Sequence, residues 1–208
     1  MLVVLASGTL AGMVRFALQH FTVIPLIQAA ESYQAAGMIH QDTAWRPEGG
    51  WQRTSFTAIT TLLTSIGFSA MLFGSMALTR RPIDARRGAV WGAAAFACFS
   101  LAPALGLPPQ PPGVPVAGVA ERQLWWVGTA VATAAGLWLL AGGRRTWLRR
   151  IGGVVCLSLP HWIGAPIAPG QSAVPVGLLR QFAIASVATA GLFWLLLGTI
   201  GGLIGSRR

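Results

Sequence analysis

Long apolar segments alternate with short polar ones along the whole chain. A helix needs about 20 apolar residues, each rising about 1.5 Å, to cross the hydrocarbon core of a bilayer. Six segments approach this length, and we predict a spanning helix in each, at about 2–27, 56–78, 88–107, 124–141, 151–167 and 182–204. The predicted fold class is therefore an all-α membrane protein with six transmembrane helices, forming a single polytopic domain over residues 1–208.

Arginine is concentrated between alternate pairs of these segments. The chain has no lysine, and ten of its fifteen arginines form three clusters, namely Arg80, Arg81, Arg86 and Arg87, then Arg144, Arg145, Arg149 and Arg150, and finally Arg207 and Arg208. The other loops balance four arginines with four acidic residues. Because short basic loops resist translocation, we predict that both termini are cytoplasmic and that loops 28–55, 108–123 and 168–181 lie outside.

The composition argues against a soluble domain. Only 10% of the residues are charged and 54% are hydrophobic, whereas a soluble domain carries about 25% charged residues. The net charge of +10 could suggest nucleic-acid binding, but the basic residues lie at helix ends, where they fit membrane topology and anionic headgroups. We therefore expect the lipid bilayer as a partner, and no nucleic acid.

The arginine pairs recur at a nearly constant spacing. Arg80, Arg144 and Arg207 each open an Arg-Arg pair, and their residue numbers differ by 64 and 63. Transporters are often built from internal repeats, and this spacing favours three helical hairpins in parallel repeat. The alternative is that the alternation of apolar and polar segments alone imposes the rhythm.

A few ionisable side chains fall within or beside the predicted spans. Such groups are costly in a membrane and are therefore functional candidates. Arg15 lies in the middle of the first span, where we expect it to face a crevice between helices. His20, Glu31 and His161 lie in or near the outer halves of their spans, and imidazole and carboxylate groups suit a divalent transition metal. The alternative for each histidine is a hydrogen-bonded position at the membrane interface.

The first outer loop and several prolines add weaker candidates. His40 and Asp42 could capture cations in the loop, although loop pairs of this kind are usually only solvated. A proline within a helix frees a backbone carbonyl, and the residues expected to shape a pore or its mouth are Arg15, Pro25, Pro108, Pro109, Pro160 and Pro166. No catalytic motif is present, so we expect neither enzyme activity nor a permanently bound cofactor.

Several short motifs follow one another along nearly the whole chain. The first is the PLIxxAExY pattern at residues 25–33, and the others are Trp45-Arg46-Pro47, Arg53-Thr54, Trp91-Gly92, the proline-rich 102–113, Gln123-Leu124-Trp125-Trp126, 159–166 and Val174-Pro175. In this combination and order they resemble the CbtA family of predicted cobalt transporter subunits.

The resemblance implies a membrane subunit for cobalt uptake that is linked to cobalamin synthesis, in the bacterial plasma (inner) membrane. Co²⁺ would be the transported substrate. It also implies a small CbtB-like partner with one spanning helix and a histidine-rich end. The alternative function is a non-conducting scaffold that positions a partner in the membrane.

Overall fold

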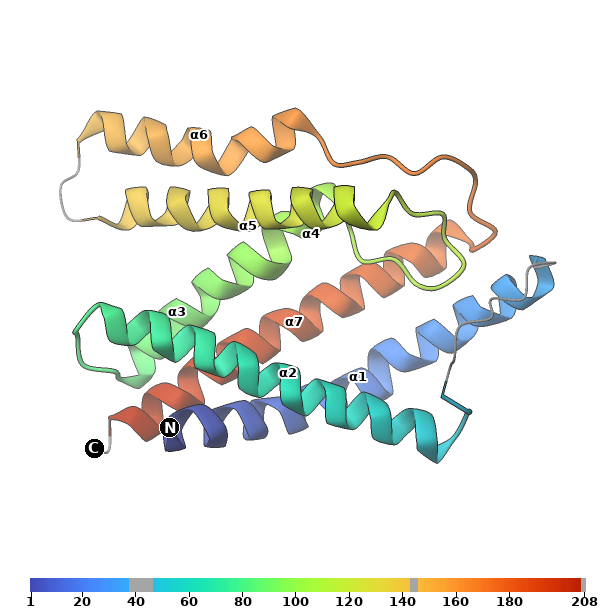
Figure 1. Ribbon diagram of the computed structural model, residues 1–208, viewed down its shortest axis with the longest axis horizontal. Helices are drawn as coiled ribbons and strands as arrows, with labels where there is room; N and C mark the ends of the chain where they lie inside the picture. The colour runs from blue at the N-terminus through green and yellow to red at the C-terminus, as the bar shows by residue number, and fades with distance from the viewer. Residues whose placement is uncertain (38–46, 143–145, 207–208) are drawn as a thin grey trace.

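The chain folds as a bundle of helices. The structure, a computed structural model, describes residues 1–37, 47–142 and 146–206, and these ranges contain helices and no strand (Figure 1). The elements in chain order are α1 (Leu2–Gly37), α2 (Trp51–Leu78), α3 (Ala85–Phe96), the π-helix η1 (Ala97–Leu101), α4 (Ala102–Gly106), α5 (Val119–Ala141), α6 (Trp147–Ile163) and α7 (Val176–Gly205). The predicted all-α class is confirmed.

Five membrane-spanning candidates are present in the described part of the chain. They are Leu2–Tyr33, Trp51–Leu78, Ala85–Gly106, Val119–Ala141 and Val176–Gly205, and each is long and apolar enough to cross a bilayer. Each overlaps a predicted span, although three of the helices begin well before the predicted start. The reason is that hydropathy marks only the part of a helix that suits hydrocarbon, whereas backbone hydrogen bonding continues into the interface.

The sixth predicted span, at 151–167, is not confirmed. Helix α6 has 17 residues, or about 25 Å of helix, which is less than the roughly 30 Å hydrocarbon core. It ends at Ile163, because Gly164 has a positive φ of 85° and Pro166 follows. Residues 164–167 are therefore not helical.

The basic residues gather at one end of the bundle. Figure 1 shows the start of α1 and the end of α7 at the same end as the link between α2 and α3. The end of α5 and the start of α6 also lie there. This end carries the described arginines of the clusters, which are Arg80, Arg81, Arg86, Arg87, Arg149 and Arg150. The uneven distribution of charge along the sequence is thus a charge difference between the two ends of the molecule.

Helix α7 lies at the centre of the bundle, against α1 and α3, while α2 packs on α1. The approach of α3 to α7 depends on glycine, since a Cβ at Gly88 would meet the carbonyl oxygen of Gly198. Beside this contact, Phe193 and Leu197 are fully buried in the core. Close backbone approach therefore fixes the position of these two helices.

Helices α5 and α6 form a separate hairpin at one edge of the bundle (Figure 1). Helix α5 joins the remainder through η1 and α4. The third hairpin of the predicted repeat would pair α6 with α7, but α6 packs on α5 and α7 packs on α1 and α3. The repeat is not confirmed by this arrangement.

A π-helical turn interrupts the third span. In η1 the Ala102 N–H donates to the carbonyl of Ala97, five residues back. Pro103 follows and has no N–H to donate, and such bulges often occur at functional sites. The hydroxyl of Ser100 in this turn accepts a hydrogen bond from Trp194 Nε1 at 3.2 Å, so the turn is joined directly to α7.

Candidate functional site

The interface between α1 and α2 carries polar side chains along most of its length. We call this set the α1–α2 seam, and its members are Ser7, Gln19, Glu31, Arg53, Thr61, Ser65 and Ser69. The hydroxyls of Ser7 and Ser69 lie 2.9 Å apart and are buried. Further along, Thr61 donates to Gln19 Oε1 at 3.5 Å. Oxygen atoms thus face one another between two spanning helices.

Small residues allow this close contact. A Cβ at Gly8 would lie 2.7 Å from Ile66 Cα, and one at Gly12 would lie 2.9 Å from Ser65 Cβ. Ser65 is buried and donates to the carbonyl of Thr61 at 2.6 Å. Its polar group is thereby satisfied within its own helix, and its oxygen retains accepting capacity toward the seam.

The end of the seam that lies away from the arginine clusters is an ion pair between Glu31 and Arg53. Arg53 donates from Nη1 to Glu31 Oε2 at 2.9 Å and from Nη2 to Oε1 at 2.6 Å. The Glu31 side chain is 36% exposed and the Arg53 side chain is 37% exposed, so water reaches both. The predicted ligand Glu31 therefore already holds a cation with both of its oxygens, in a bidentate arrangement.

Arg15 lies on α1 but faces α7. Its guanidinium carbon is 4.8 Å from the centroid of the Phe193 ring, a cation–π contact. Its Nε is buried and has no hydrogen-bond partner in the described part of the chain. Arg15 thus lies between α1 and α7, and its role in shaping a pore stays a prediction.

The two predicted histidine ligands lie on different sides of the bundle. His20 is exposed on α1, with the Phe21 ring 5.3 Å away. His161 is half-buried near the end of α6, with its ring centroid 6.2 Å from that of Trp125. Figure 1 shows α1 and α6 at opposite edges of the molecule, so these side chains do not share one site within a single chain.

The structure does not assemble the predicted ligand set. Within residues 1–37, 47–142 and 146–206, no three His, Cys, Asp or Glu side chains are grouped so as to hold a metal ion. His40 and Asp42 fall outside these described residues. The metal-binding role of His20, Glu31 and His161 remains a prediction.

The predicted prolines occupy different settings. Pro25 lies inside α1, which continues unbroken to Gly37, and Pro160 is buried in the last turn of α6. Pro166 follows that helix in the link to α7. Pro108 and Pro109 line a pocket of about 320 Å³ together with Ser100, Arg122 and Trp126. Their role in shaping a mouth stays a prediction.

Residues 1–205 match the family model described as "Probable cobalt transporter subunit (CbtA)". The chain belongs to the CbtA family. No curated protein and no solved structure matches it. CbtA is named for transport rather than catalysis, in agreement with the lack of catalytic motifs, and a subunit works with another chain.

Two of the motifs that carry the CbtA resemblance meet at the ion pair. Glu31 belongs to the motif at 25–33, and Arg53 begins the Arg53-Thr54 pair. Their side chains bond across α1 and α2. The sequence motifs contain both residues but do not indicate that they pair, because their contact depends on the relative register of two helices.

The neutral members of the α1–α2 seam were not predicted at all. Ser7, Thr61, Ser65 and Ser69 are common residue types in membrane helices and carry no signal individually. Their spacing along the sequence does carry information. Serine and threonine recur at helical spacing in 54–69, which indicates one polar face on this helix.

Proposed function

We propose that this CbtA chain is the membrane subunit of a Co²⁺ uptake transporter that supplies cobalamin synthesis, in the bacterial plasma membrane and with both termini cytoplasmic. The observation that carries the proposal is the α1–α2 seam, which ends in a partly exposed carboxylate. Carboxylate and other oxygen groups can accept a divalent cation on its way between water and the membrane interior. Co²⁺ is the cargo in this proposal.

Glu31 is the proposed point of capture. In the present arrangement its carboxylate is neutralised by Arg53. An arriving Co²⁺ competes with the guanidinium for the same two oxygens, and Arg53 swings toward water as the cation binds. Because both groups are partly exposed, the pair is weak, about 0–1 kcal/mol, so the exchange requires little energy.

Arg15 limits the proposed pathway on the α7 side of α1. Its positive charge lies between α1 and α7, where it repels any cation that enters on that side. Between α1 and α2, the seam offers neutral oxygens and the carboxylate of Glu31, which is paired with Arg53. Entry into a negative interior favours a divalent cation by about 4.6 kcal/mol per 100 mV, twice the value for a single charge.

The histidines are proposed as further ligands that need a second chain. His20 is eleven residues from Glu31, which is about 16 Å along a helix, so the two would act at successive positions. His161 belongs to α6, which lies at the far edge of the molecule in Figure 1. A small single-span partner with a histidine-rich end, of the CbtB-like kind, would bring additional nitrogen donors to either position.

The test is uptake of radioactive cobalt by cells that lack other cobalt importers. The chain is expressed with and without its partner, and nickel and zinc are added as competitors. Replacing Glu31 and His161 together by alanine should lower saturable uptake about tenfold or more, since even residues that only support a metal ligand contribute that much.

The matched control is Glu121→Ala, which removes an exposed acid from the first turn of α5, away from the seam. It should leave uptake unchanged. Full uptake by a correctly inserted Glu31→Ala/His161→Ala variant would remove both residues from the mechanism.

The second candidate function, a non-conducting scaffold, is favoured by the close glycine packing of α3 on α7. Such packing fixes two backbones in place and suits a rigid platform for a partner. Absence of uptake in both strains, combined with loss of the partner from membranes when this chain is deleted, would select the scaffold.

A further inference from the structure

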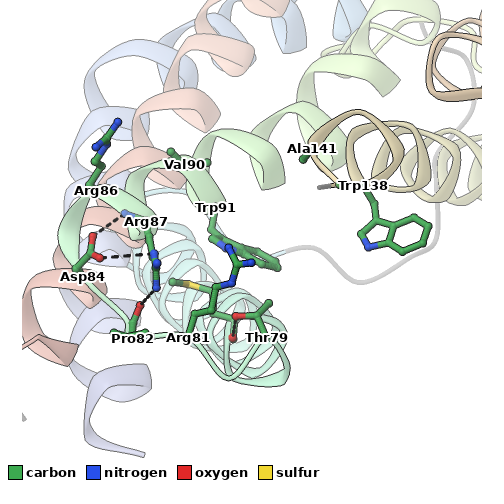
Figure 2. Close-up of a pocket in the computed structure, with 12 residues that line it drawn as sticks. Thr79, Arg81, Pro82, Asp84, Arg86, Arg87, Val90, Trp91, Trp138 and Ala141 are labelled. Carbon is green, nitrogen blue, oxygen red and sulfur yellow. Dashed lines mark hydrogen bonds and ion pairs between the residues drawn. The ribbon is translucent and has the colours of Figure 1, made fainter. Parts of the chain in front are cut away.

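A pocket of about 790 Å³ opens at the basic end of the molecule (Figure 2). It lies between the link from α2 to α3 and the end of α5. Its lining combines charge with large aromatic rings, and includes Arg81, Asp84, Arg87, Trp91, Trp138 and Ala141. None of these residues belongs to the α1–α2 seam.

The pocket carries net positive charge that the described residues do not neutralise. The Asp84 carboxylate is engaged by Arg87, whose Nε lies 3.8 Å from it and whose backbone N–H donates to it at 2.9 Å. Arg87 Nη1 donates to the carbonyl of Pro82 at 2.9 Å. Arg81 is exposed and has no hydrogen bond or ion pair with any described residue, so its guanidinium is available to an anion.

Figure 2 shows how these groups are directed. Arg81 extends toward the ring of Trp91, while Arg86 points outward from the rim. Trp138 lies across from them on α5, and Arg149 of α6 places its guanidinium carbon 5.2 Å from the Trp138 ring centroid. Cations and tryptophans in this arrangement are typical of the depth at which lipid headgroups lie.

The same pocket continues into an apolar groove of about 460 Å³. The two share Val90, Trp91, Trp138 and Ala141, and the groove then runs between α2, α3 and α5. Small side chains form much of its wall, among them Ala94 and Ala134. The groove therefore leads from a charged mouth into the part of the molecule that faces hydrocarbon.

We propose that this composite site binds one anionic phospholipid, with its phosphate at Arg81 and Arg87 and an acyl chain in the groove. Charge complementarity decides the ligand class, because arginine binds phosphate oxygens in bidentate fashion. Basic pockets at the cytoplasmic ends of spanning helices are known to take anionic headgroups. A single apolar helix would fill the groove but would leave the charged mouth unpaired. The site is independent of the proposed metal pathway.

The first experiment is native mass spectrometry of the detergent-purified chain, titrated with phosphatidylglycerol or phosphatidylcholine of the same chain length. We expect one phosphatidylglycerol to bind in clear preference to phosphatidylcholine. Arg81→Gln should weaken its binding about fivefold, the effect of one arginine near an anionic surface. Arg180→Gln, an exposed arginine at the opposite end, should have no effect. Equal binding of the two lipids, or equal weakening by both variants, would overturn the proposal.

The second experiment separates a lipid from a free phosphate. Ala94→Leu fills the groove without changing a charge, and should weaken phosphatidylglycerol about fourfold for each methylene that it excludes. Val131→Leu, on an exposed face of α5 outside the groove, is the control. If Ala94→Leu has no effect, or if inorganic phosphate displaces the lipid at equal concentration, the site is not a phospholipid site. Thermal unfolding of each variant shows whether it is folded.

Discussion

At the scale of single residues, Arg15 on α1 and Arg53 on α2 differ in what surrounds their charge. Arg15 faces the ring of Phe193, and its buried Nε has no hydrogen-bond partner among the described residues. Arg53 instead meets a carboxylate at the edge of water. The first charge is fixed inside the bundle, whereas the second can leave its partner at low cost.

This difference gives a prediction for cobalt affinity. Arg53→Gln removes the competitor for Glu31 and keeps the carboxylate, so the cobalt concentration for half-maximal uptake should fall, by up to about fivefold for a pair of this exposure. Glu31→Gln removes the carboxylate and should raise the cobalt concentration for half-maximal uptake. Uptake kinetics over a range of cobalt concentrations measure both values.

Arg180→Gln serves as the control for this prediction, since it removes an exposed charge of the same sign at the same end. If the half-saturation concentration fell equally in Arg180→Gln, the effect would come from general surface charge and not from the pair with Glu31. An unchanged or higher half-saturation concentration in Arg53→Gln would argue against the proposed exchange at Glu31.

At the scale of helices, glycine decides which pairs pack most closely. A Cβ at Gly88 meets a backbone carbonyl of α7, which cannot rotate away as a side chain can. A Cβ at Gly128 of α5 meets nothing within 4 Å. The same substitution should therefore have opposite effects at these two positions.

Gly88→Ala should lower the free energy of unfolding by about 1–3 kcal/mol, the usual effect of overpacking. Gly128→Ala should raise it by up to about 1 kcal/mol, because alanine has the higher helix propensity. Denaturant unfolding in detergent, followed by circular dichroism, measures both. Shifts in the same direction would contradict the close packing of α3 on α7.

The helices also show which features of the fold can be predicted from the sequence. Hydropathy located five of the six predicted spans, because burial in hydrocarbon is set segment by segment. It did not locate the π-helical turn at 97–101, where Ser100 is bonded to Trp194 of another helix. Glu31 was singled out as an ionisable residue but without its partner, because the pairing of α1 with α2 is a property of packing.

At the scale of the whole molecule, the charge difference between the two ends should determine orientation. Six described cluster arginines share one end (Figure 1), and basic ends remain in the cytoplasm. The links that precede α5 and α7 lie at the other end. The orientation can be tested at one position on each side.

Single cysteines replace Arg81 and Ser172 in a chain whose Cys98 and Cys156 are changed to alanine. A membrane-impermeant maleimide should label the cysteine at position 172 on intact cells. It should label that at position 81 only after the membrane is opened. The reverse pattern would place the termini outside.

The short helix α6 has a consequence for how the protein is made. At about 25 Å it cannot span a typical bilayer unaided, and two arginines, Arg149 and Arg150, lie in its first turn. It packs closely on α5, where a Cβ at Gly136 would lie 2.9 Å from the Gly153 carbonyl oxygen. During biosynthesis we therefore expect α5 to remain at the insertion machinery until α6 has been translated. The two helices would then enter the lipid together as a preformed pair.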